Sequence, residues 1–349
     1  MVKESYTICV MRGDGIGPEI VDATISLLDS IQERNHFKLH YTFVPAGDSA
    51  LKEYGDPLPE RSIEQFANSD ACLKGPVGET IGDINQRLRF GFDLYANIRP
   101  ARSYKGICPP ALRPDIDLIV IRENSEGFYR AIESEVEPGI WTTMGVFTEK
   151  GARRLANFAF GYASRNRHMR KVTLATKANI FRKTHGLYLK TFQETARQFS
   201  DVNFEHLYAD ALCARLVRDP QNFDVIVSEN LLADLLSDLA GQIAGGLGMT
   251  PGTNINYETK RAFFEPTHGS APDIAGKGIA NPIGQVRSAA LMLEFLGFAN
   301  HDTRLTEAAT HFEKGIATLL NSPNKENLPI ELGGTANTQR VAELISQFF

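Results

Sequence analysis

The sequence predicts an α/β protein built on a largely parallel sheet, and three observations support this fold class. Runs of apolar and β-branched residues alternate with helix-like patterns along most of the chain, which is typical of βαβ units. The length of 349 residues exceeds that of an average domain, so we expect two domains or one large α/β unit. A content of 42% hydrophobic and 23% charged residues is ordinary for a globular enzyme and excludes a disordered or fibrous chain.

The individual elements follow from local patterns in chain order. The expected strands are short apolar runs at residues 6–11, 118–122, 171–175 and 223–227. The expected helices carry apolar residues at helical spacing and lie at residues 18–32, 151–164, 186–199, 231–244, 284–296 and 302–320. Pro18 suits the first turn of its helix, because the N–H that proline lacks would have no partner there. The proline-rich segment 107–114 indicates a connector, and therefore a domain boundary near residue 100.

Charge and cysteine content limit the partners and the compartment. The chain has 37 basic and 42 acidic side chains, a formal net charge of −5, and no basic run, so we expect no nucleic-acid partner. No stretch reaches the roughly 18 apolar residues that a membrane helix needs, so we expect no membrane partner. The first ten residues lack a signal-peptide pattern and the four cysteines lie far apart, which predicts free thiols in a cytoplasmic protein.

A glycine-rich motif, GDGIG at residues 13–17, follows the first expected strand and opens the first helix. Its spacing differs from the GxGxxG pattern of dinucleotide-binding sites. No acidic residue clearly ends a second strand about 20 positions later, as that pattern requires. The alternative is a tight strand–helix turn whose glycines adopt positive φ. The motif alone leaves both interpretations open.

Three aspartates predict a site for a hard metal ion. Asp234 and Asp238 lie four residues apart in a helical pattern, so they share one face and repel each other unless a cation intervenes. Asp210 follows another short apolar run. Aspartates without accompanying His or Cys suit Mg²⁺ or Mn²⁺. The alternative is a solvated acidic helix face.

Several further polar residues lie beside apolar segments. Arg89, Arg99 and Arg122 flank strongly apolar runs, and a guanidinium binds carboxylates with two parallel hydrogen bonds. Tyr129 and Lys177 lie near strand ends, where the proton-transfer groups of α/β enzymes gather. The alternative for each residue is a surface ion pair. Together they favour an enzyme that acts on a di- or tricarboxylate with a divalent metal.

Five segments, in the right order, resemble the β-hydroxyacid oxidative decarboxylases, which are the isocitrate and 3-isopropylmalate dehydrogenase family. They are residues 13–17, 93–100, 122–129, 230–238 and 265–282, with Ala233 where the family usually has glycine. The resemblance covers essentially the whole chain and implies this family's fold instead of the Rossmann fold. It implies a large α/β cofactor-binding domain from residues 1–98 and 245–349, and a small α/β domain from 99–244 with a dimer clasp at about 128–150.

The resemblance also implies the chemistry, which is oxidative decarboxylation of a malate-type 2-hydroxy acid. The implied substrate-binding residues are Asp83, Asn85, Arg89, Arg99 and Arg122, the proton-transfer residues are Tyr129 and Lys177, and the ligands of Mg²⁺ or Mn²⁺ are Asp210, Asp234 and Asp238. Members of the family form homodimers with shared active sites. Lys177 and Asp210 would accordingly act in the partner's site.

The cofactor implied by the resemblance is NAD. The cofactor-binding residues would be His268, Gly269, Ser270, Ala271, Asp273, Ile274 and Asn281. In this family the position of Asp273 faces the adenosine ribose. A carboxylate there accepts hydrogen bonds from the ribose hydroxyls and repels the 2′-phosphate of NADP.

The segment before Arg89 bears on the substrate. Asn85 stands at the position of an asparagine in isocitrate enzymes, and Gln86 stands where a leucine would contact an isopropyl group. Burying both amides against methyl groups would cost about 1–3 kcal/mol each, which disfavours isopropylmalate. Asp83 replaces a serine that would contact the third carboxylate of isocitrate, and Arg87 is the nearby cation that could neutralise it.

We therefore expect isocitrate or homoisocitrate first. D-malate, tartrate and 3-isopropylmalate remain alternatives, and so does a non-catalytic regulatory subunit of an isocitrate dehydrogenase.

Overall fold

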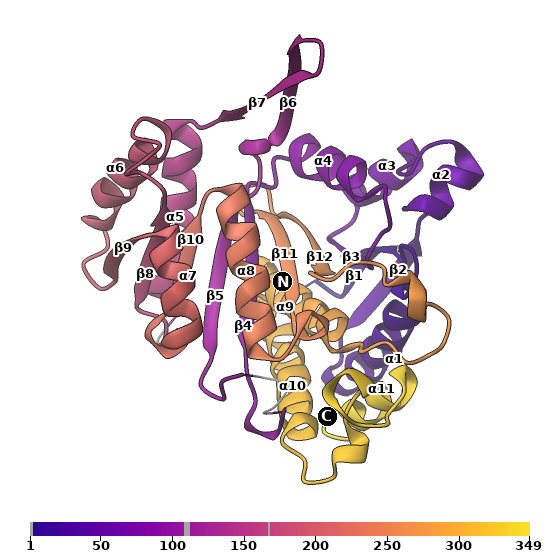
Figure 1. The fold of residues 1–349 in the computed structure, drawn as a ribbon. Helices are drawn as coiled ribbons and strands as arrows, with labels where there is room; N and C mark the ends of the chain where they lie inside the picture. Colours follow the sequence, from indigo (N-terminus) through magenta and orange to yellow (C-terminus); the bar gives the residue numbers. More distant parts are fainter. Residues whose placement is uncertain (1–2, 108–111, 167) are drawn as a thin grey trace. The chain divides into compact units, whose positions relative to one another are not determined.

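The computed structural model describes residues 3–107, 112–166 and 168–349, and the chain forms two compact units (Figure 1). The first unit comprises Met1–Phe92, Tyr104–Pro114 and Gly245–Phe349, and the second comprises Asp93–Ser103 and Asp115–Ala244. The sequence predicted boundaries after residues 98 and 244. The first boundary lies earlier, after Phe92, because strand β4 (Ala96–Arg102) pairs along its whole length with a strand of the second unit.

The first unit contains a mixed sheet with strand order β2-β1-β3-β12-β11. Its strands are β1 (Ser5–Met11), β2 (Lys38–Phe43), β3 (Ala71–Lys74), β11 (Pro251–Asn256) and β12 (Arg261–Pro266). β1 pairs in parallel with both β2 and β3, and β12 pairs in parallel with β3. β11 and β12 are antiparallel neighbours. Segments from both ends of the chain therefore share one sheet.

Seven α-helices and several 3₁₀ turns of the first unit are described. They are α1 (Gly17–Asn35), α2 (Asp48–Tyr54), α3 (Glu60–Asn68), α4 (Ile81–Gly91), α9 (Ile283–Asn300), α10 (Thr303–Leu320) and α11 (Thr338–Ser346), with η1 (Lys105–Ile107), η3 (Leu247–Met249), η4 (Pro272–Ile274), η5 (Lys325–Asn327) and η6 (Ile330–Leu332). α9 contacts β3, β11 and β12 on the sheet and α1 and α10 beside it. Because α9 is covered on several sides, it is apolar over most of its surface.

The second unit contains a five-stranded run with order β4-β5-β10-β8-β9. Its strands are β4, β5 (Asp117–Glu123), β8 (Lys171–Thr176), β9 (Asn203–Tyr208) and β10 (Val225–Ser228), and its helices are α5 (Glu149–Arg165), α6 (Thr184–Ala196), α7 (Ala209–Arg218) and α8 (Asn230–Ala244), with η2 (Pro220–Asn222). All neighbours are parallel except β4 and β5. Leu212, Leu236, Val120 and Ile226 are among the buried residues of one cluster that joins α7 and α8 to the strands. This packing fixes which face of α8 is free to carry polar groups.

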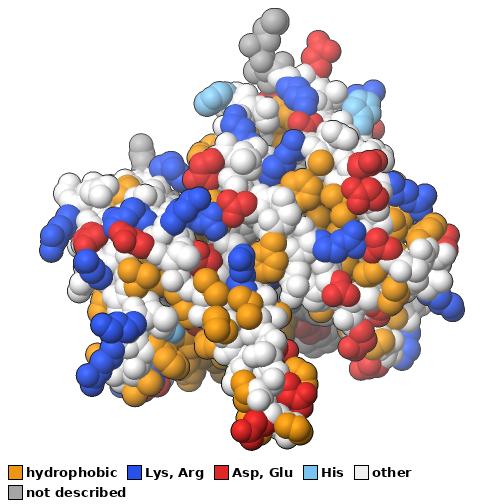
Figure 2. Space-filling model, turned by 90° about the horizontal axis from the view of Figure 1, so that it is seen from above, with side chains coloured by type: hydrophobic (Ala, Val, Ile, Leu, Met, Phe, Trp, Pro, Cys, Tyr) orange, Lys and Arg blue, Asp and Glu red, His pale blue; other side chains and the backbone are white. Residues whose placement is uncertain are grey.

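A long hairpin, β6 (Gly127–Glu137) and β7 (Ile140–Val146), projects from the second unit (Figure 1). It covers most of the segment at about 128–150 that was predicted as a clasp, and it begins one residue earlier. Most of its side chains are exposed, including the large apolar residues Trp141 and Met144. On the face drawn in Figure 2, exposed hydrophobic side chains lie among charged side chains of both signs.

The predicted strands and helices all exist, and their ends differ by a few residues. The helix predicted at 18–32 continues to Asn35 and ends where His36 adopts the left-handed conformation, with φ of 57°. The strand predicted at 223–227 begins only at Val225, because residues 220–222 form a 3₁₀ turn. Within the described residues no helix is both long and apolar enough to cross a bilayer. Cys9, Cys72 and Cys213 are free thiols, although Cys213 is only partly buried; Cys108 lies outside the described residues.

The glycine-rich turn depends on close backbone packing, and this can be tested at Gly15. Its φ is +58°, and a Cβ atom there would lie 1.9 Å from the carbonyl oxygen of Ser270. We expect Gly15→Ala to lower the free energy of unfolding, measured by urea denaturation, by about 2 kcal/mol or more. Gly82→Ala is the control, because no heavy atom lies within 4 Å of a Cβ at this helical position. Equal stability of the two variants would contradict the prediction.

Candidate active site

A cluster of charged side chains in the second unit centres on Asp234 of α8. Arg99 Nη1 donates to Asp234 Oδ1 at 3.0 Å and to Asp238 Oδ1 at 3.2 Å. Arg122 Nη1 also donates to Asp234 Oδ1, and the Tyr129 hydroxyl donates to Asp234 Oδ2. The fold therefore gathers five residues that the sequence singled out separately.

The two arginines are presented by neighbouring antiparallel strands. Arg99 lies on β4 and Arg122 on β5, and their residues are only 8% and 1% exposed. Asn97 Oδ1 accepts from Arg99 Nε at 2.9 Å, and Asn230 Oδ1 accepts from Arg122 Nε at 2.8 Å. In each arginine an amide oxygen accepts from Nε, so the terminal Nη atoms of the guanidinium are left to bind carboxylates.

The two α8 aspartates lie on one face of the helix, and the guanidinium of Arg99 is the cation that contacts both of them. One Arg99 nitrogen contacts both carboxylates and also Ser237 Oγ at 2.9 Å. Burial raises the pKa of Asp238, and Asp234 adds to this, while Arg99 lowers it. The pair is therefore tolerated because Arg99 compensates the repulsion between like charges.

Tyr129 begins the hairpin and turns back onto the same cluster. Its ring lies beneath the Arg122 guanidinium, 4.6 Å from ring centroid to Cζ. Burial and the hydrogen bond to Asp234 raise the pKa of the phenol, and Arg122 opposes this. The hydroxyl accordingly keeps its proton at neutral pH, which suits a proton donor.

Lys177 and Asp210 form a separate pair in the second unit. Lys177 Nζ lies 2.9 Å from Asp210 Oδ1, and this hydrogen bond lowers the pKa of Asp210. Lys177 directly follows β8, and its backbone N–H donates to Nδ1 of the buried His185 at 3.0 Å. Burial lowers the pKa of His185, so the ring stays neutral and can accept this bond.

The carboxylates fit a divalent cation in chemistry but are not assembled within one chain. Among the described residues there is no group of three His, Cys, Asp or Glu side chains placed to hold a metal ion. Asp234 and Asp238 share Arg99 as a partner, while Asp210 is paired with Lys177. The oxygen donors suit Mg²⁺ or Mn²⁺, and Asp234 and Asp238 are the two of the three predicted carboxylates that share one partner.

Arg89 belongs to a buried network of the first unit. Its Nε donates to Asn254 Oδ1 at 3.0 Å, and its guanidinium lies 3.6 Å from Glu265. Glu265 also accepts from Lys74 Nζ at 2.6 Å and from Asn254 Nδ2 at 3.0 Å. Burial raises the pKa of Glu265, but Lys74 and Arg89 outweigh this and hold the pKa below its usual value.

Helix α4 carries the residues that the sequence linked to the substrate side chain. Asp83 and Gln86 are exposed, while Asn85 is 9% exposed and no described group donates to its Oδ1. Arg87 donates to Asp56 at 2.5 Å, so its partner in this structure is Asp56, and the role of Arg87 in neutralising Asp83 stays a prediction. The loop before α3 supplies this competing carboxylate, and the α4 sequence gave no sign of it.

The predicted cofactor residues form one loop of the first unit after β12. Ala271 adopts positive φ, Asp273 lies in the short turn η4, and Ile274 packs against Ile16 and Ile20 of the first helical segment. His268 Nδ1 contacts the Gly269 carbonyl, while its buried Nε2 has no partner among the described residues. A buried ring nitrogen in this state fits a ligand that supplies the missing hydrogen bond.

The glycine-rich turn supports the cofactor loop instead of forming a Rossmann loop. The Ile16 N–H donates to the Ser270 carbonyl at 2.9 Å, and Gly15 allows this close approach. Glu19 accepts from the N–H groups of Gly278 and Ala280 at 3.0 and 3.3 Å. The alternative of a tight strand–helix turn is therefore the correct one.

Several residues of these networks escaped the sequence analysis. They are Lys74, Asn97, His185, Asn230, Ser237, Asn254, Glu265 and Glu331. Glu331 accepts from Asn281 Nδ2 at 2.8 Å, across 50 residues of sequence. A lysine at the end of the apolar run 71–74 was the one readable signal, because lysine is rarely buried without a partner.

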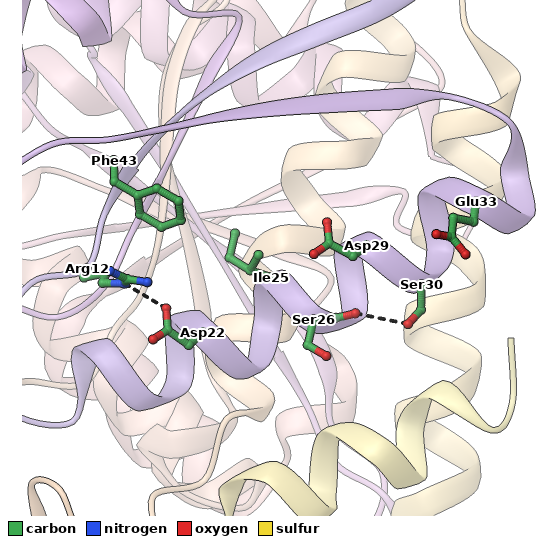
Figure 3. A pocket seen from close by; sticks show the side chains of 8 residues that line it. All are labelled: Arg12, Asp22, Ile25, Ser26, Asp29, Ser30, Glu33 and Phe43. Carbon is green, nitrogen blue, oxygen red and sulfur yellow. Dashed lines mark hydrogen bonds and ion pairs between the residues drawn. The ribbon is translucent and has the colours of Figure 1, made fainter.

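A hollow of about 460 Å³ lies on the surface of the first unit beside α1 (Figure 3). Arg12, Asp22, Asp29, Glu33 and Phe43 are among its lining residues. Arg12 pairs with Asp22 at 2.7 Å and lies over the Phe43 ring. The hollow contains none of the predicted site residues, so we do not assign it to the reaction.

Comparison with known proteins identifies the family. The family model described as isocitrate/isopropylmalate dehydrogenase matches residues 7–345. This chain belongs to that family. It is 43% identical to the 3-isopropylmalate/3-methylmalate dehydrogenase of Methanocaldococcus jannaschii, over 98% of each chain. It is 38% identical to the mitochondrial isocitrate dehydrogenase [NAD] subunit alpha of Macaca fascicularis, over 97% of this chain and 94% of that one.

A solved structure of isocitrate dehydrogenase from Methylococcus capsulatus has a TM-score of 0.90 and 36% identity, and the match covers 98% of this chain and 99% of that one. The predicted family and fold class are thereby confirmed. As a member of this family the protein is a decarboxylating oxidoreductase. The individual site residues remain predictions.

Glu123, which directly follows Arg122, shapes the loop leading to the hairpin. Its residue is 1% exposed, and its carboxylate accepts from Ser125 Oγ at 2.7 Å and from the Glu126 N–H at 2.6 Å. Burial raises the pKa of Glu123 to about 7, although these hydrogen bonds oppose the change. The native protein therefore retains a proton that the unfolded chain releases near pH 4.5.

Because the native state holds more protons between pH 4.5 and 7, the free energy of unfolding should fall as pH rises through this window. The shift corresponds to about 3 kcal/mol from Glu123. Urea denaturation of wild type and Glu123→Gln at several pH values isolates this contribution, because glutamine does not titrate. We expect wild type to lose stability relative to the variant on going from pH 5 to 8. Parallel pH profiles would contradict the assignment.

Proposed function

We propose that the protein catalyses NAD-dependent, divalent-metal-dependent oxidative decarboxylation of a 3-substituted malate. The observation that carries this proposal is the cluster of Arg99, Arg122, Tyr129, Asp234 and Asp238. It combines two buried cations for carboxylates, two aspartates for a cation and a protonated phenol. Arg89 remains a proposed substrate-binding residue.

Each group of the chain has a place in the reaction. When bound, the divalent cation would polarise the 2-hydroxyl oxygen and NAD would accept the hydride from C2. Arg99 and Arg122 would hold the substrate carboxylates and so fix the orientation of C2. Lys177 would take the hydroxyl proton. The resulting 2-keto acid loses its β-carboxylate as CO₂, and Tyr129 would deliver a proton to C3.

From the sequence we expected isocitrate first, and two findings change this order. The relative from M. jannaschii, at 43% identity, is named for 3-isopropylmalate and 3-methylmalate. In addition, Arg87 is engaged by Asp56, so a third substrate carboxylate near Asp83 would lack the compensation expected from Arg87. We therefore place malates with an uncharged 3-alkyl group first.

Isocitrate remains the second candidate because of Asn85. The side chain is nearly buried and its Oδ1 has no partner among the described groups, so a polar substituent would satisfy it better than methyl groups would. The relative named as an isocitrate dehydrogenase subunit supports the same candidate. A purely regulatory role is disfavoured, because Tyr129, Lys177 and the three aspartates are all present.

The experiment that tests the proposal is NADH formation from a panel of hydroxy acids with Mg²⁺ or Mn²⁺. The panel contains 3-methylmalate, 3-isopropylmalate, isocitrate, homoisocitrate, D-malate and tartrate. We expect the highest kcat/KM with an alkylmalate and loss of activity with a chelator. A preference for isocitrate would select the second candidate, and full activity in chelator would exclude the assigned metal ligands.

We further propose a homodimer with shared sites. Large apolar side chains of the second unit are exposed on the hairpin, on the segment after Lys177 and on α8, namely Trp141, Met144, Ile180, Phe181 and Leu235. Large exposed apolar groups in such numbers favour burial by another protein surface, here a second copy. Asp210 of the partner would then join Asp234 and Asp238. The free thiols support a reducing compartment such as the cytoplasm.

Cofactor choice should follow from the exposed Asp273 on the cofactor loop. Its carboxylate would accept hydrogen bonds from ribose hydroxyls and repel a 2′-phosphate. We expect kcat/KM with NAD to exceed that with NADP by at least about 100-fold, equal to about 2.7 kcal/mol. Steady-state kinetics with both cofactors measure the ratio, and Asp273→Asn should reduce it. Similar efficiencies in wild type would overturn the assignment.

Shared sites predict complementation between two inactive variants. Each site would need Tyr129 from one chain and Lys177 from the other, so Tyr129→Phe and Lys177→Ala homodimers should both be nearly inactive. A mixed dimer carries both lesions in one site and keeps the other intact. Random subunit exchange should restore about a quarter of wild-type activity, because about half of the dimers are mixed and each has one intact site. Absence of recovery after verified exchange would show that Lys177 does not serve the partner's site.

A further inference from the structure

Asp14, in the glycine-rich turn, has no part in the reaction described above, yet its carboxylate is fully engaged. Oδ2 accepts hydrogen bonds from the backbone N–H groups of Asp48 at 2.8 Å and Gly78 at 3.0 Å, and Oδ1 accepts from Ser49 at 3.1 Å. Two main-chain donors from the first turn of α2 and one from the loop before α4 thus converge on one side chain. Asp14 therefore binds the protein's own backbone.

Asp48, whose N–H binds Asp14, in turn accepts hydrogen bonds with its own carboxylate. Its Oδ2 accepts from the Glu79 N–H at 3.1 Å, and its Oδ1 accepts from the Thr80 N–H at 3.0 Å and the Thr80 hydroxyl at 2.8 Å. Burial raises the pKa of Asp48, but the hydrogen bonds from Thr80 and Glu79 outweigh this and hold the pKa below its usual value. The carboxylate is accordingly ionised at neutral pH and accepts all three bonds.

Glycines leave the space that the two carboxylates occupy. A Cβ atom at Gly47 would lie 2.2 Å from Asp14 Oδ2, and one at Gly78 would lie 2.0 Å from Asp48 Oδ2. A Cβ at Gly13 would lie 2.0 Å from the Pro76 carbonyl oxygen. The close approach of these loops to both aspartates is therefore built into the sequence.

These contacts connect Asp14 through Asp48 to the first turn of α4. Thr80 is the residue before α4 and makes no side-chain cap to its own helix, because its hydroxyl is bonded to Asp48. The first turn of α4 is thus held from outside the helix. Asp83, Asn85 and Arg89 follow within the same helix. A displacement of its first turn would move these side chains relative to a substrate and so weaken the contacts that bind it.

We propose that Asp14 and Asp48 are positioning residues for substrate recognition, which act in series to fix the first turn of α4 to the turn after β1. The inference rests on the proposed function, since it takes α4 as the helix that meets the hydroxy acid. It assigns the GDGIG motif a role in acid recognition, in addition to its packing against the cofactor loop. Neither aspartate touches the substrate.

The test is Asp48→Asn, which replaces one acceptor oxygen by an amide donor. In either orientation of the amide, a backbone N–H of Glu79 or Thr80 then faces another donor. We expect KM for the hydroxy acid to rise about tenfold or more, while kcat and KM for NAD change less than about twofold. Thr80→Val, which removes only the hydroxyl, should act in the same direction by a smaller factor. Asp22→Asn is the matched control, because Asp22 pairs with Arg12 on the surface of α1.

Hydrogen exchange provides a readout that does not depend on the substrate. Asp48→Asn should accelerate amide exchange in residues 78–84 and leave the rest of the chain at wild-type rates. Unchanged amide exchange in residues 78–84 would overturn the positioning role, whether or not the protein oxidises an acid. If wild type oxidises no hydroxy acid, this separate result overturns the proposed function. Faster exchange with an unchanged acid KM would overturn the role in recognition. If Asp48→Asn does not fold, the KM for the hydroxy acid and the amide exchange of residues 78–84 are measured on Thr80→Val, and the same outcomes test the proposal.

Discussion

The contact of Arg99 with both Asp234 and Asp238 is the interaction on which the site of the second unit depends. Two carboxylates one helical turn apart repel each other, and an arginine that is 8% exposed needs a counter-charge. Each group therefore makes the other tolerable. Removing the carboxylates would leave the buried guanidinium of Arg99 without its counter-charges, which is unfavourable because Arg99 is shielded from water. The amide of Asn97, which anchors Arg99 Nε, belongs to the same constraint.

This interaction has a direct consequence for binding. The groups that would hold a dicarboxylate and a divalent cation contact one another in this structure. A substrate carboxylate that takes Arg99 and Arg122 would release Asp234 and Asp238, and a cation on the aspartates would release the arginines. Either ligand would thereby lower the cost of binding the other, which is a coupling between two sites in the thermodynamic sense. The hydrogen bond from Tyr129 to Asp234 would be exchanged in the same step.

The family could be predicted from five segments that resemble its motifs, and the fold class from the alternation of strand and helix patterns. Apolar flanks and helical spacing marked Arg99, Arg122, Asp234 and Asp238 locally. The sequence did not predict that Arg99 would pair with Asp234, since 135 residues separate them and their meeting depends on how α8 packs on β4 and β5. The same limit explains why Arg87 was assigned to Asp83. The sequence pattern around Arg87 points to Asp83 because this carboxylate is close to Arg87 in the sequence. In the structure Arg87 instead donates to Asp56, which lies in the loop before α3. Glu265 and Lys74 were missed because their pairing spans 191 residues.

The most direct test of this account is calorimetric titration of the protein with Mg²⁺, in the absence and in the presence of a saturating hydroxy acid and without NAD. A parallel titration of the acid alone corrects for its own affinity for the cation. If the arginines and aspartates exchange partners as described, Mg²⁺ should bind at least about tenfold more tightly in the presence of the acid, and the acid should gain the same factor from Mg²⁺. Equal Mg²⁺ affinities with and without the acid would contradict the account.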